Sequence, residues 1–197
     1  RIVAVLGNAV NLIDANGNGS MSRAASLPSA TNWKMPAVEY DTGKLLVVRQ
    51  GGGVSLIDIN GPTPVVTEGA GVGPRRDWAS LTVLPDGQVL LTGGGIDNKG
   101  GDNISLGSSI WNPATGAWTE VAPAAKSREY HSVALLLPDG RVLSAGGGAP
   151  GVVIQLNGEV YTPPSLYDAA GNLAARPAIA SAPATMAPGT TPYRFRM

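Results

Sequence analysis

The chain has 197 residues, and its 14 lysines and arginines balance 14 aspartates and glutamates, so the formal net charge is zero. A zero balance without a basic run gives nucleic acid no electrostatic footprint and gives an anionic membrane surface no polybasic patch. No apolar run reaches about 18 residues, so no transmembrane helix is expected. The absence of cysteine excludes disulfides, thiolate metal sites and cysteine nucleophiles within these residues.

Four turn-punctuated units follow one another along the chain. Residues 1–23 form a partial unit, in which residues 8–14 followed by Asn16-Gly17-Asn18-Gly19 are typical of the end of an early unit. Residues 31–72 and 75–123 hold two fuller units, and another unit begins near residue 128. With 27 glycines, 16 prolines and only 14% charged residues, the chain has many turns and few strong helix formers. This composition indicates an all-β globular protein.

The repeat is clearest between the last two units. Residues 81–95 (LTVLPDGQVLLTGGG) match residues 134–148 (ALLLPDGRVLSAGGG), and a looser copy spans residues 37–53. A period of roughly 45–50 residues is typical of β-propeller blades, of the kelch type in particular. Each unit predicts a buried strand, a tight Pro-Asp-Gly turn, a return strand and a glycine triplet where a Cβ would clash with a neighbouring segment.

We therefore predict an all-β, kelch-type β-propeller over residues 1–172, as a partial ring of about three to four blades. Propellers close with four to eight blades, and kelch rings usually need more blades than this chain holds. The chain is therefore expected to be an internal or C-terminal piece of a larger ring, with a closed four-bladed ring as the less favoured alternative. It begins at Arg1 without a secretory hydrophobic core, as a processed chain or a segment would. The composition changes after residue 172, and residues 173–197 are expected to begin a second β domain that ends prematurely at Met197.

His131 is the only histidine, and it follows Tyr130 where an inter-blade loop enters the first strand of a blade. Side chains that are neighbours on a regular strand point to opposite faces, so the pair can share a ligand only if the chain bends there. A buried aromatic pair satisfied by hydrogen bonds explains the same residues, and the pattern alone favours that interpretation. The polar loop over residues 96–103 is either the rim of a site or an ordinary solvated loop.

The preceding unit offers a comparison for this pair. Aligned on their serines, Arg76-Asp77-Trp78-Ala79-Ser80 matches Arg128-Glu129-Tyr130-His131-Ser132. The shared arginine and acid predict a structural pair across the blade junction rather than catalytic groups. The later segment differs in having Tyr130-His131 where this alignment places Trp78-Ala79 in the earlier one.

Residues 127–142 (SREYHSVALLLPDGRV), followed by Gly146-Gly147-Gly148, are similar to the copper radical oxidases of the galactose oxidase and glyoxal oxidase family. Residues 159–177 also resemble that family, in the part where the last kelch blade leads into an immunoglobulin-like C-terminal domain. The likeness is specific, because Tyr-His-Ser followed by Leu-Leu-Pro-Asp-Gly-Arg is not a generic kelch pattern.

The resemblance implies a secreted or periplasmic protein with a seven-bladed kelch propeller, so residues 173–197 would start an immunoglobulin-like domain. It implies a copper ion bound by two tyrosines and two histidines. On this chain it assigns an equatorial copper ligand to His131, and both the axial ligand and the catalytic base to Tyr130. Imidazole and phenolate suit Cu(II), which lowers the pKa of a bound hydroxyl group and so eases proton transfer to a base.

Two hypotheses for the function stay open. The radical cofactor of that family is a second tyrosine joined to a cysteine, and this chain has no cysteine and no second histidine. The segment alone is therefore expected to be inactive, whereas a longer parent would oxidise a small alcohol, aldehyde or carbohydrate with O2 and release H2O2. The alternative is a non-catalytic kelch propeller that binds a glycan or a protein partner. Neither nucleic acid nor a membrane is an expected partner.

Overall fold

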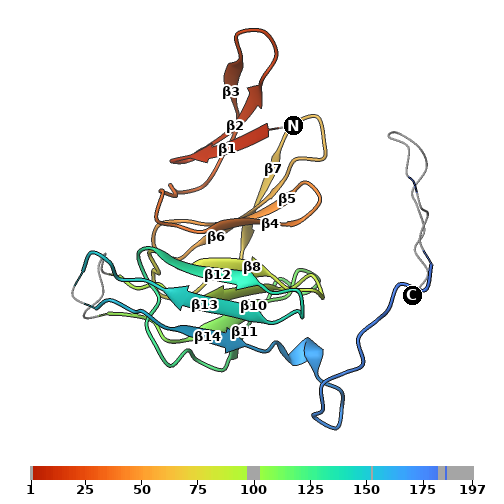
Figure 1. Cartoon of the computed structure of the whole chain (residues 1–197). Helices are drawn as coiled ribbons and strands as arrows, with labels where there is room; N and C mark the ends of the chain where they lie inside the picture. The colour runs from red at the N-terminus through yellow and green to blue at the C-terminus, as the bar shows by residue number, and fades with distance from the viewer. Residues whose placement is uncertain (1, 97–102, 152, 182–184, 186–197) are drawn as a thin grey trace. The chain divides into compact units, whose positions relative to one another are not determined.

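A computed structural model describes residues 2–96, 103–151, 153–181 and 185. The chain divides into two compact units, residues 1–163 and residues 164–197. All the named strands belong to the first unit (Figure 1). In the part of the chain that the structure describes, we find no helix with the length and apolar character needed to cross a bilayer.

The first unit consists of four antiparallel sheets, each a simple meander in chain order. The first sheet contains β1 (Ile2–Leu6), β2 (Ala9–Asp14) and β3 (Ser20–Ser26). The second contains β4 (Ala37–Asp41), β5 (Lys44–Val48), β6 (Val54–Asp58) and β7 (Val65–Gly69). The third contains β8 (Ser80–Val83), β9 (Val89–Thr92), β10 (Ser108–Trp111) and β11 (Trp118–Val121). The fourth contains β12 (Ser132–Leu136), β13 (Val142–Gly146) and β14 (Gly158–Tyr161).

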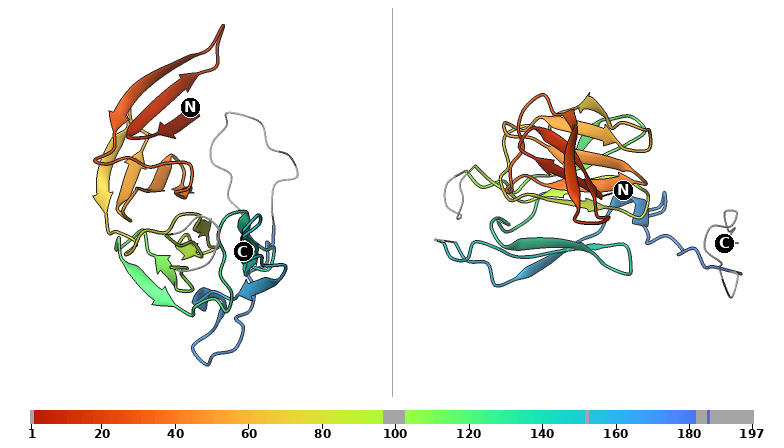
Figure 2. Two further views of the ribbon diagram at one scale, coloured as in Figure 1. Left: turned by 90° about the vertical axis from the view of Figure 1, so that its left-hand side faces the viewer. Right: turned by 90° about the horizontal axis from the view of Figure 1, so that it is seen from above.

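Successive sheets are neighbours in space, as blades of a propeller are (Figure 2). Strand β8 contacts both β4 and β12, so the first strands of three successive sheets lie side by side. Strand β3 contacts β7, the last strand of the second sheet. An arrangement with first strands together on one side and last strands on the other is that of blades around a propeller axis. The predicted fold class, an all-β partial propeller, is confirmed.

The first and last sheets each have three described strands instead of four. The β2 sequence Val10-Asn11-Leu12-Ile13-Asp14 differs from β6 Val54-Ser55-Leu56-Ile57-Asp58 only at the second position. Together with the contact between β3 and β7, this match makes β1–β3 the counterparts of β5–β7. Within the described residues, the first sheet thus has no counterpart of β4, and the fourth sheet has no counterpart of β11.

The core lies between the sheets, and the middle strands are buried on both faces. Leu46 and Val48 of β5 face the third sheet, whereas Val47 between them faces the first sheet. Leu91 of β9 faces the second sheet and Leu90 faces the fourth, because consecutive strand residues point to opposite sides. A strand covered on both sides needs apolar residues at every position, which explains the continuous apolar runs in the sequence.

The Pro-Asp-Gly segments form the tight turns that the sequence predicts. Gly87 has a φ of 80°, and its amide donates to the carbonyl of Leu84 at 2.9 Å. The Asp86 carboxylate accepts from the amide of Gln88 at 3.1 Å, so this acid stabilises its own turn. The later Pro138-Asp139-Gly140 turn repeats the pattern, with a bond of 2.9 Å from the Gly140 amide to the Leu137 carbonyl.

The second unit begins at Pro164, nine residues before residue 173, where the sequence predicts the second domain to start (173 − 164 = 9). It opens with a short 3-10 helix, Pro164–Leu166, and a turn in which the Asp168 amide donates to the Asn172 carbonyl at 2.8 Å. Residues 182–184 and 186–197 lie outside the described residues. The start of an immunoglobulin-like domain at residues 173–197 therefore stays a prediction.

Candidate metal-binding site

The segment leading into β12, residues 127–131, is held between two glycine triplets. The Gly94 amide of the third sheet donates to the Arg128 carbonyl at 2.6 Å. The Gly148 amide of the fourth sheet donates to the Tyr130 carbonyl at 2.7 Å. The backbone of the candidate site is thus fixed on both sides by main-chain bonds, which do not depend on any side-chain conformation.

Close packing against this segment explains why glycine is needed in the first triplet. A Cβ at Gly93 would lie 2.5 Å from the Arg128 carbonyl oxygen, and one at Gly94 would lie 2.9 Å from the Cβ of Ala79. Both residues have positive φ angles, 71° and 83°, which side-chain-bearing residues rarely adopt. The predicted role of the triplet, close passage of a neighbouring segment, is confirmed at these two positions.

Arg128 anchors the same segment from inside the fourth sheet. Its side chain is only 2% exposed, and the guanidinium donates to the carbonyl groups of Gly146 and Asn157 at 3.1 Å each. It also donates to Asn157 Oδ1 at 2.7 Å and to Glu159 Oε1 at 3.1 Å. Arg128 therefore ties the loop before β12 to β13 and to the residues that begin β14, which is a structural role.

The chain bends at His131, as a shared ligand requires. His131 has a φ of 63°, in the left-handed region that is uncommon for residues other than glycine. The bend brings its ring face to face with that of Tyr130, with a centroid distance of 3.7 Å and an interplanar angle of 26°. Tyr130 is half-buried and His131 is exposed. The two side chains therefore lie together instead of on opposite faces of a strand.

The hydrogen bond to the His131 ring determines which nitrogen is available to a metal. Nδ1 lies 2.9 Å from the Ala149 carbonyl oxygen. A carbonyl oxygen only accepts, so Nδ1 carries the proton and donates, and Nε2 keeps its lone pair. A hydrogen bond from the ring nitrogen that does not bind the metal is the usual way in which proteins orient a metal-binding imidazole.

The repeat alignment that places Tyr-His opposite Trp-Ala is wrong by one residue. The Gly95 amide donates to the Asp77 carbonyl, and Gly148 makes the equivalent bond to Tyr130. Trp78, with a φ of 65°, shares the left-handed backbone of His131. Trp78 and His131 are therefore equivalent, and so are Asp77 and Tyr130. The alignment on serine is wrong because the two serines are not equivalent. Ser80 pairs with Thr92 and Val133 pairs with Ala145, the residue directly before the glycine triplet in each unit, so Ser80 is the counterpart of Val133.

The arginine and acid of the two units also pair differently from the prediction. Arg75, not Arg76, binds Asp77 through two bonds of 2.6 Å, and this bond raises the pKa of the Arg75 guanidinium. Arg76 instead donates to the Gly107 carbonyl at 2.7 Å. The ion pair across the blade junction comes from Lys34, whose Nζ lies 3.8 Å from Asp77.

Two tryptophans that sequence analysis did not assign to the site adjoin the Tyr130–His131 pair. Trp78 contacts the Tyr130 ring at a centroid distance of 4.6 Å, and Trp33 contacts Trp78 at 4.8 Å. Trp33 precedes β4, just as Trp78 precedes β8. Comparing the residues before the first strand of each unit would have revealed this row of aromatic residues.

The donor set fits part of a copper site. An imidazole and a phenol ring stand side by side, and both are ligand types that Cu(II) accepts. Among the described residues, no group of three or more His, Cys, Asp or Glu side chains lies together in a way that could hold a metal. The predicted rim loop, residues 96–103, falls largely outside the described residues, which omit 97–102.

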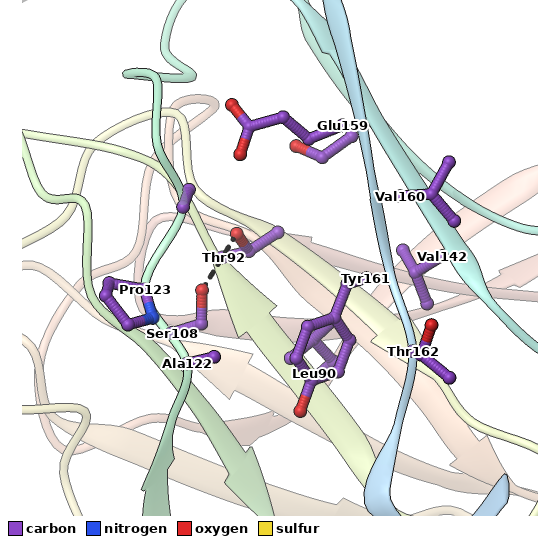
Figure 3. Close-up of a pocket in the computed structure, with 12 residues that line it drawn as sticks. Leu90, Thr92, Ser108, Ala122, Pro123, Val142, Glu159, Val160, Tyr161 and Thr162 are labelled. Atoms are coloured by element: carbon purple, nitrogen blue, oxygen red, sulfur yellow. Dashed lines mark hydrogen bonds between the residues drawn. The ribbon is translucent and has the colours of Figure 1, made fainter.

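A separate pocket of about 290 Å³ lies between the third and fourth sheets (Figure 3). It is lined on one side by Leu90, Thr92 and Ser108 and on the other by residues of β13 and β14. The hydroxyl groups of Thr92 and Ser108 lie 3.2 Å apart and hydrogen-bond to each other. The lining residues include neither Tyr130 nor His131, so this pocket is not the candidate metal-binding site.

The architecture and the site define the class of protein, a β-propeller with a stacked tyrosine and histidine before the first strand of one blade. Galactose oxidase from Gibberella zeae is 34% identical over 162 residues, covering 73% of this chain and 24% of that protein. An aldehyde oxidase from Arabidopsis thaliana is 27% identical over 115 residues, covering 51% and 19%. No protein-family model matches the chain.

A solved structure shares the fold over most of the chain. It is described as a novel fungal alcohol oxidase with catalytic diversity among the AA5 family, in complex with copper. The TM-score is 0.80 at 27% identity, with 89% of this chain and 40% of that chain covered. The chain belongs to the copper radical oxidase family of galactose oxidase and glyoxal oxidase, as the resemblance indicated. It spans about a quarter of the length of the galactose oxidase that it matches.

Proposed function

We propose that this chain supplies two copper ligands, Tyr130 and His131, to an oxidase that converts a primary alcohol or aldehyde with O2 and releases H2O2. The observation that carries the proposal is the stacked pair itself, with Nδ1 of His131 committed to the Ala149 carbonyl and Nε2 left for a metal. The family relationship supports the same assignment. Kelch-type repeats, a seven-bladed ring and secretion belong to this proposal too.

The two side chains would have different tasks. His131 would bind copper through Nε2, and the bond from Nδ1 to the carbonyl would hold the ring in place and increase its basicity. Tyr130, as a phenolate, would bind copper and would be the base that accepts the proton of the substrate hydroxyl. When bound, Cu(II) supplies Lewis acidity and a one-electron redox partner.

Such a site needs groups that this chain does not contain. The chain has no cysteine and no histidine besides His131, so it offers neither a tyrosine–cysteine link nor a second imidazole ligand. The proposal therefore requires a longer protein that adds a second tyrosine, a cysteine and a histidine. The substrate would be a small alcohol, aldehyde or carbohydrate.

The same absences favour the second candidate function, a propeller that binds a glycan or protein partner without catalysis. The sequence of the parent protein separates the two candidates. A cysteine in an upstream blade and a histidine in a C-terminal domain would support the oxidase. Their absence from the full parent sequence would leave the binding function.

Titration of the chain with Cu(II), followed by electron paramagnetic resonance and visible absorption, tests the ligand assignment. The wild-type chain should give a bound-copper spectrum with a nitrogen ligand and a phenolate-to-copper absorption band. His131→Ala should lose the nitrogen signal and most of the affinity, and Tyr130→Phe should lose the absorption band. Tyr161→Phe, which removes a tyrosine from the separate pocket, should bind copper like the wild type. Equal affinity in wild type and His131→Ala would overturn the assignment.

In the full-length protein, Tyr130→Phe should abolish turnover while leaving copper bound through the remaining ligands. Full retained turnover would remove Tyr130 from the proposed base role.

A further inference from the structure

A row of aromatic rings runs from the molecular surface to the candidate site. Trp33, Trp78 and Tyr130 precede the first strands of the second, third and fourth sheets. Neighbouring ring centroids lie 4.8 Å and 4.6 Å apart, in edge-to-face contacts, and Tyr130 then stacks on His131 at 3.7 Å. No other residue is needed between them, so the rings form an unbroken series from one blade to the next.

Exposure falls from Trp33 to the next two rings, and His131 beyond them is exposed again. Trp33 is 77% exposed, although a large apolar side chain that serves only packing is usually buried. Trp78 and Tyr130 are half-buried. The row therefore has one end open to solvent and the other end at the ring that we assign to copper.

We propose that Trp33, Trp78 and Tyr130 form a path for single electrons between the protein surface and the candidate copper site. Indole and phenol rings lose one electron more readily than other unmodified side chains, and rings in contact allow short transfer steps. An external one-electron oxidant removes an electron from Trp33, an electron from Trp78 refills Trp33, and one from Tyr130 refills Trp78. The oxidant gains one electron, and Tyr130, which is half-buried, gives one electron to Trp78 and its phenolic proton to solvent water, becoming a neutral radical.

Charges beside the row shape its energetics. The Lys34 ammonium lies 5.8 Å from the Trp33 ring centroid and 5.9 Å from that of Trp78. A cation at this distance disfavours a positive charge on either indole. The buried Asp77 carboxylate, 3.8 Å from Lys34 and also bound by Arg75, offsets part of that effect. The tryptophans are therefore better suited to brief passage of the charge than to storing it.

The path itself does not depend on copper, whereas its use in the protein rests on the proposed function. We therefore test it on the metal-free chain. Because the chain contains no cysteine, Ser29→Cys, at an exposed position shortly before Trp33, gives a unique attachment point for a ruthenium polypyridyl photo-oxidant. A laser flash with an electron acceptor in solution generates Ru(III), and transient absorption then distinguishes tryptophanyl from tyrosyl radicals.

The labelled chain should form a tryptophanyl radical first and a tyrosyl radical next. Tyr130→Phe should abolish the tyrosyl signal, which identifies its source among the tyrosines. Trp78→Phe should reduce the tyrosyl yield to the level measured in Tyr130→Phe. The phenylalanine ring retains the packing of the tryptophan but lacks its redox activity. Trp118→Phe, at a tryptophan that instead donates to the Ala70 carbonyl, is the matched control and should behave like the wild type.

If the tyrosyl yield in Trp78→Phe equals that of the labelled chain without this substitution, the proposal is overturned, and the row serves packing alone. If Trp78→Phe does not fold, Trp33→Phe provides the second test, since it should also delay and reduce the tyrosyl signal. Copper titration of the folded variant separates the two proposals. Unchanged copper binding with a lost tyrosyl signal supports both, and an unchanged tyrosyl signal refutes only the electron path.

Discussion

Replacing Arg128 with methionine tests how the Tyr130–His131 segment is held. The change removes a guanidinium that is 2% exposed and makes four hydrogen bonds, three of them to Gly146 and Asn157. The fourth bond goes to the Glu159 carboxylate, which is 29% exposed, so water can hydrogen-bond to this carboxylate in place of the lost guanidinium. Removing one partner of a buried charged network costs about 3–5 kcal/mol. We expect Arg128→Met to lower the free energy of unfolding by that amount.

Urea unfolding monitored by tryptophan fluorescence measures this loss. With a denaturant slope of about 2 kcal/mol per molar, the midpoint should fall by roughly 2 M. Arg141→Gln is the control, because Arg141 pairs with Asp139 on the surface and its loss should leave the midpoint unchanged. Arg128→Lys should recover only part of the stability, since an ammonium group cannot reproduce the planar fork of donors.

The site gives a second readout of the same substitution. If Arg128 positions the loop before β12, Arg128→Met should also weaken copper binding under conditions where the chain remains folded. A midpoint shift no larger than that of Arg141→Gln would refute the reasoning.

Three further predictions follow from the fold. Gly94→Ala should unfold at a clearly lower temperature than Gly116→Ala in paired thermal melts. Both glycines have positive φ angles, so each alanine costs about 1–2 kcal/mol for its left-handed backbone. Only the new Cβ at Gly94 also meets other atoms within 4 Å, which adds to that cost. Equal melting points would contradict this. Leu46→Ala, at a position with 0% exposure, should cost about 2–5 kcal/mol in urea unfolding, and a smaller loss would mean that the space collapses. Burial raises the pKa of Tyr161 above its usual 10.0, so the unfolded chain loses this proton first. Stability should therefore fall as the pH rises above about 10, with a shallower fall in Tyr161→Phe; identical profiles would refute this contribution.

Local rules in the sequence were sufficient for the repeated units. The Pro-Asp-Gly turns depend on neighbours within a few residues, and the structure confirms them. The glycine triplet was predicted from its place in the repeat, although the segment that approaches Gly93 contains the distant residue Arg128. The four sheets follow the predicted units closely: the fourth begins at Ser132, near the predicted start at residue 128. The motif around Tyr130 was also sufficient to identify the family.

Pairings between residues far apart in the chain were beyond the sequence. The acid partner of Arg128 is Glu159, in a strand whose distance from Arg128 along the chain gives no indication of contact. The equivalence of Trp78 with His131, in contrast, was within reach of the sequence, because it has the same offset as residues 81–95 and 134–148, and the main-chain bonds to Gly95 and Gly148 confirm it. The bend at His131 is a backbone property: the Ser132 amide donates to the Glu129 carbonyl at 2.8 Å, which closes a turn around Tyr130 and His131, and the Gly148 amide binds the Tyr130 carbonyl.

By itself, the sequence determined the all-β class, the blade period, the turn positions and the candidate pair Tyr130–His131. Only the tertiary structure decided that the two rings stack, that Nδ1 of His131 is committed to Ala149, and that Trp33 and Trp78 continue the row. The physical reason is the range of the interactions. Turns and strands arise from short-range backbone preferences, whereas the site forms where segments from three successive sheets are packed together.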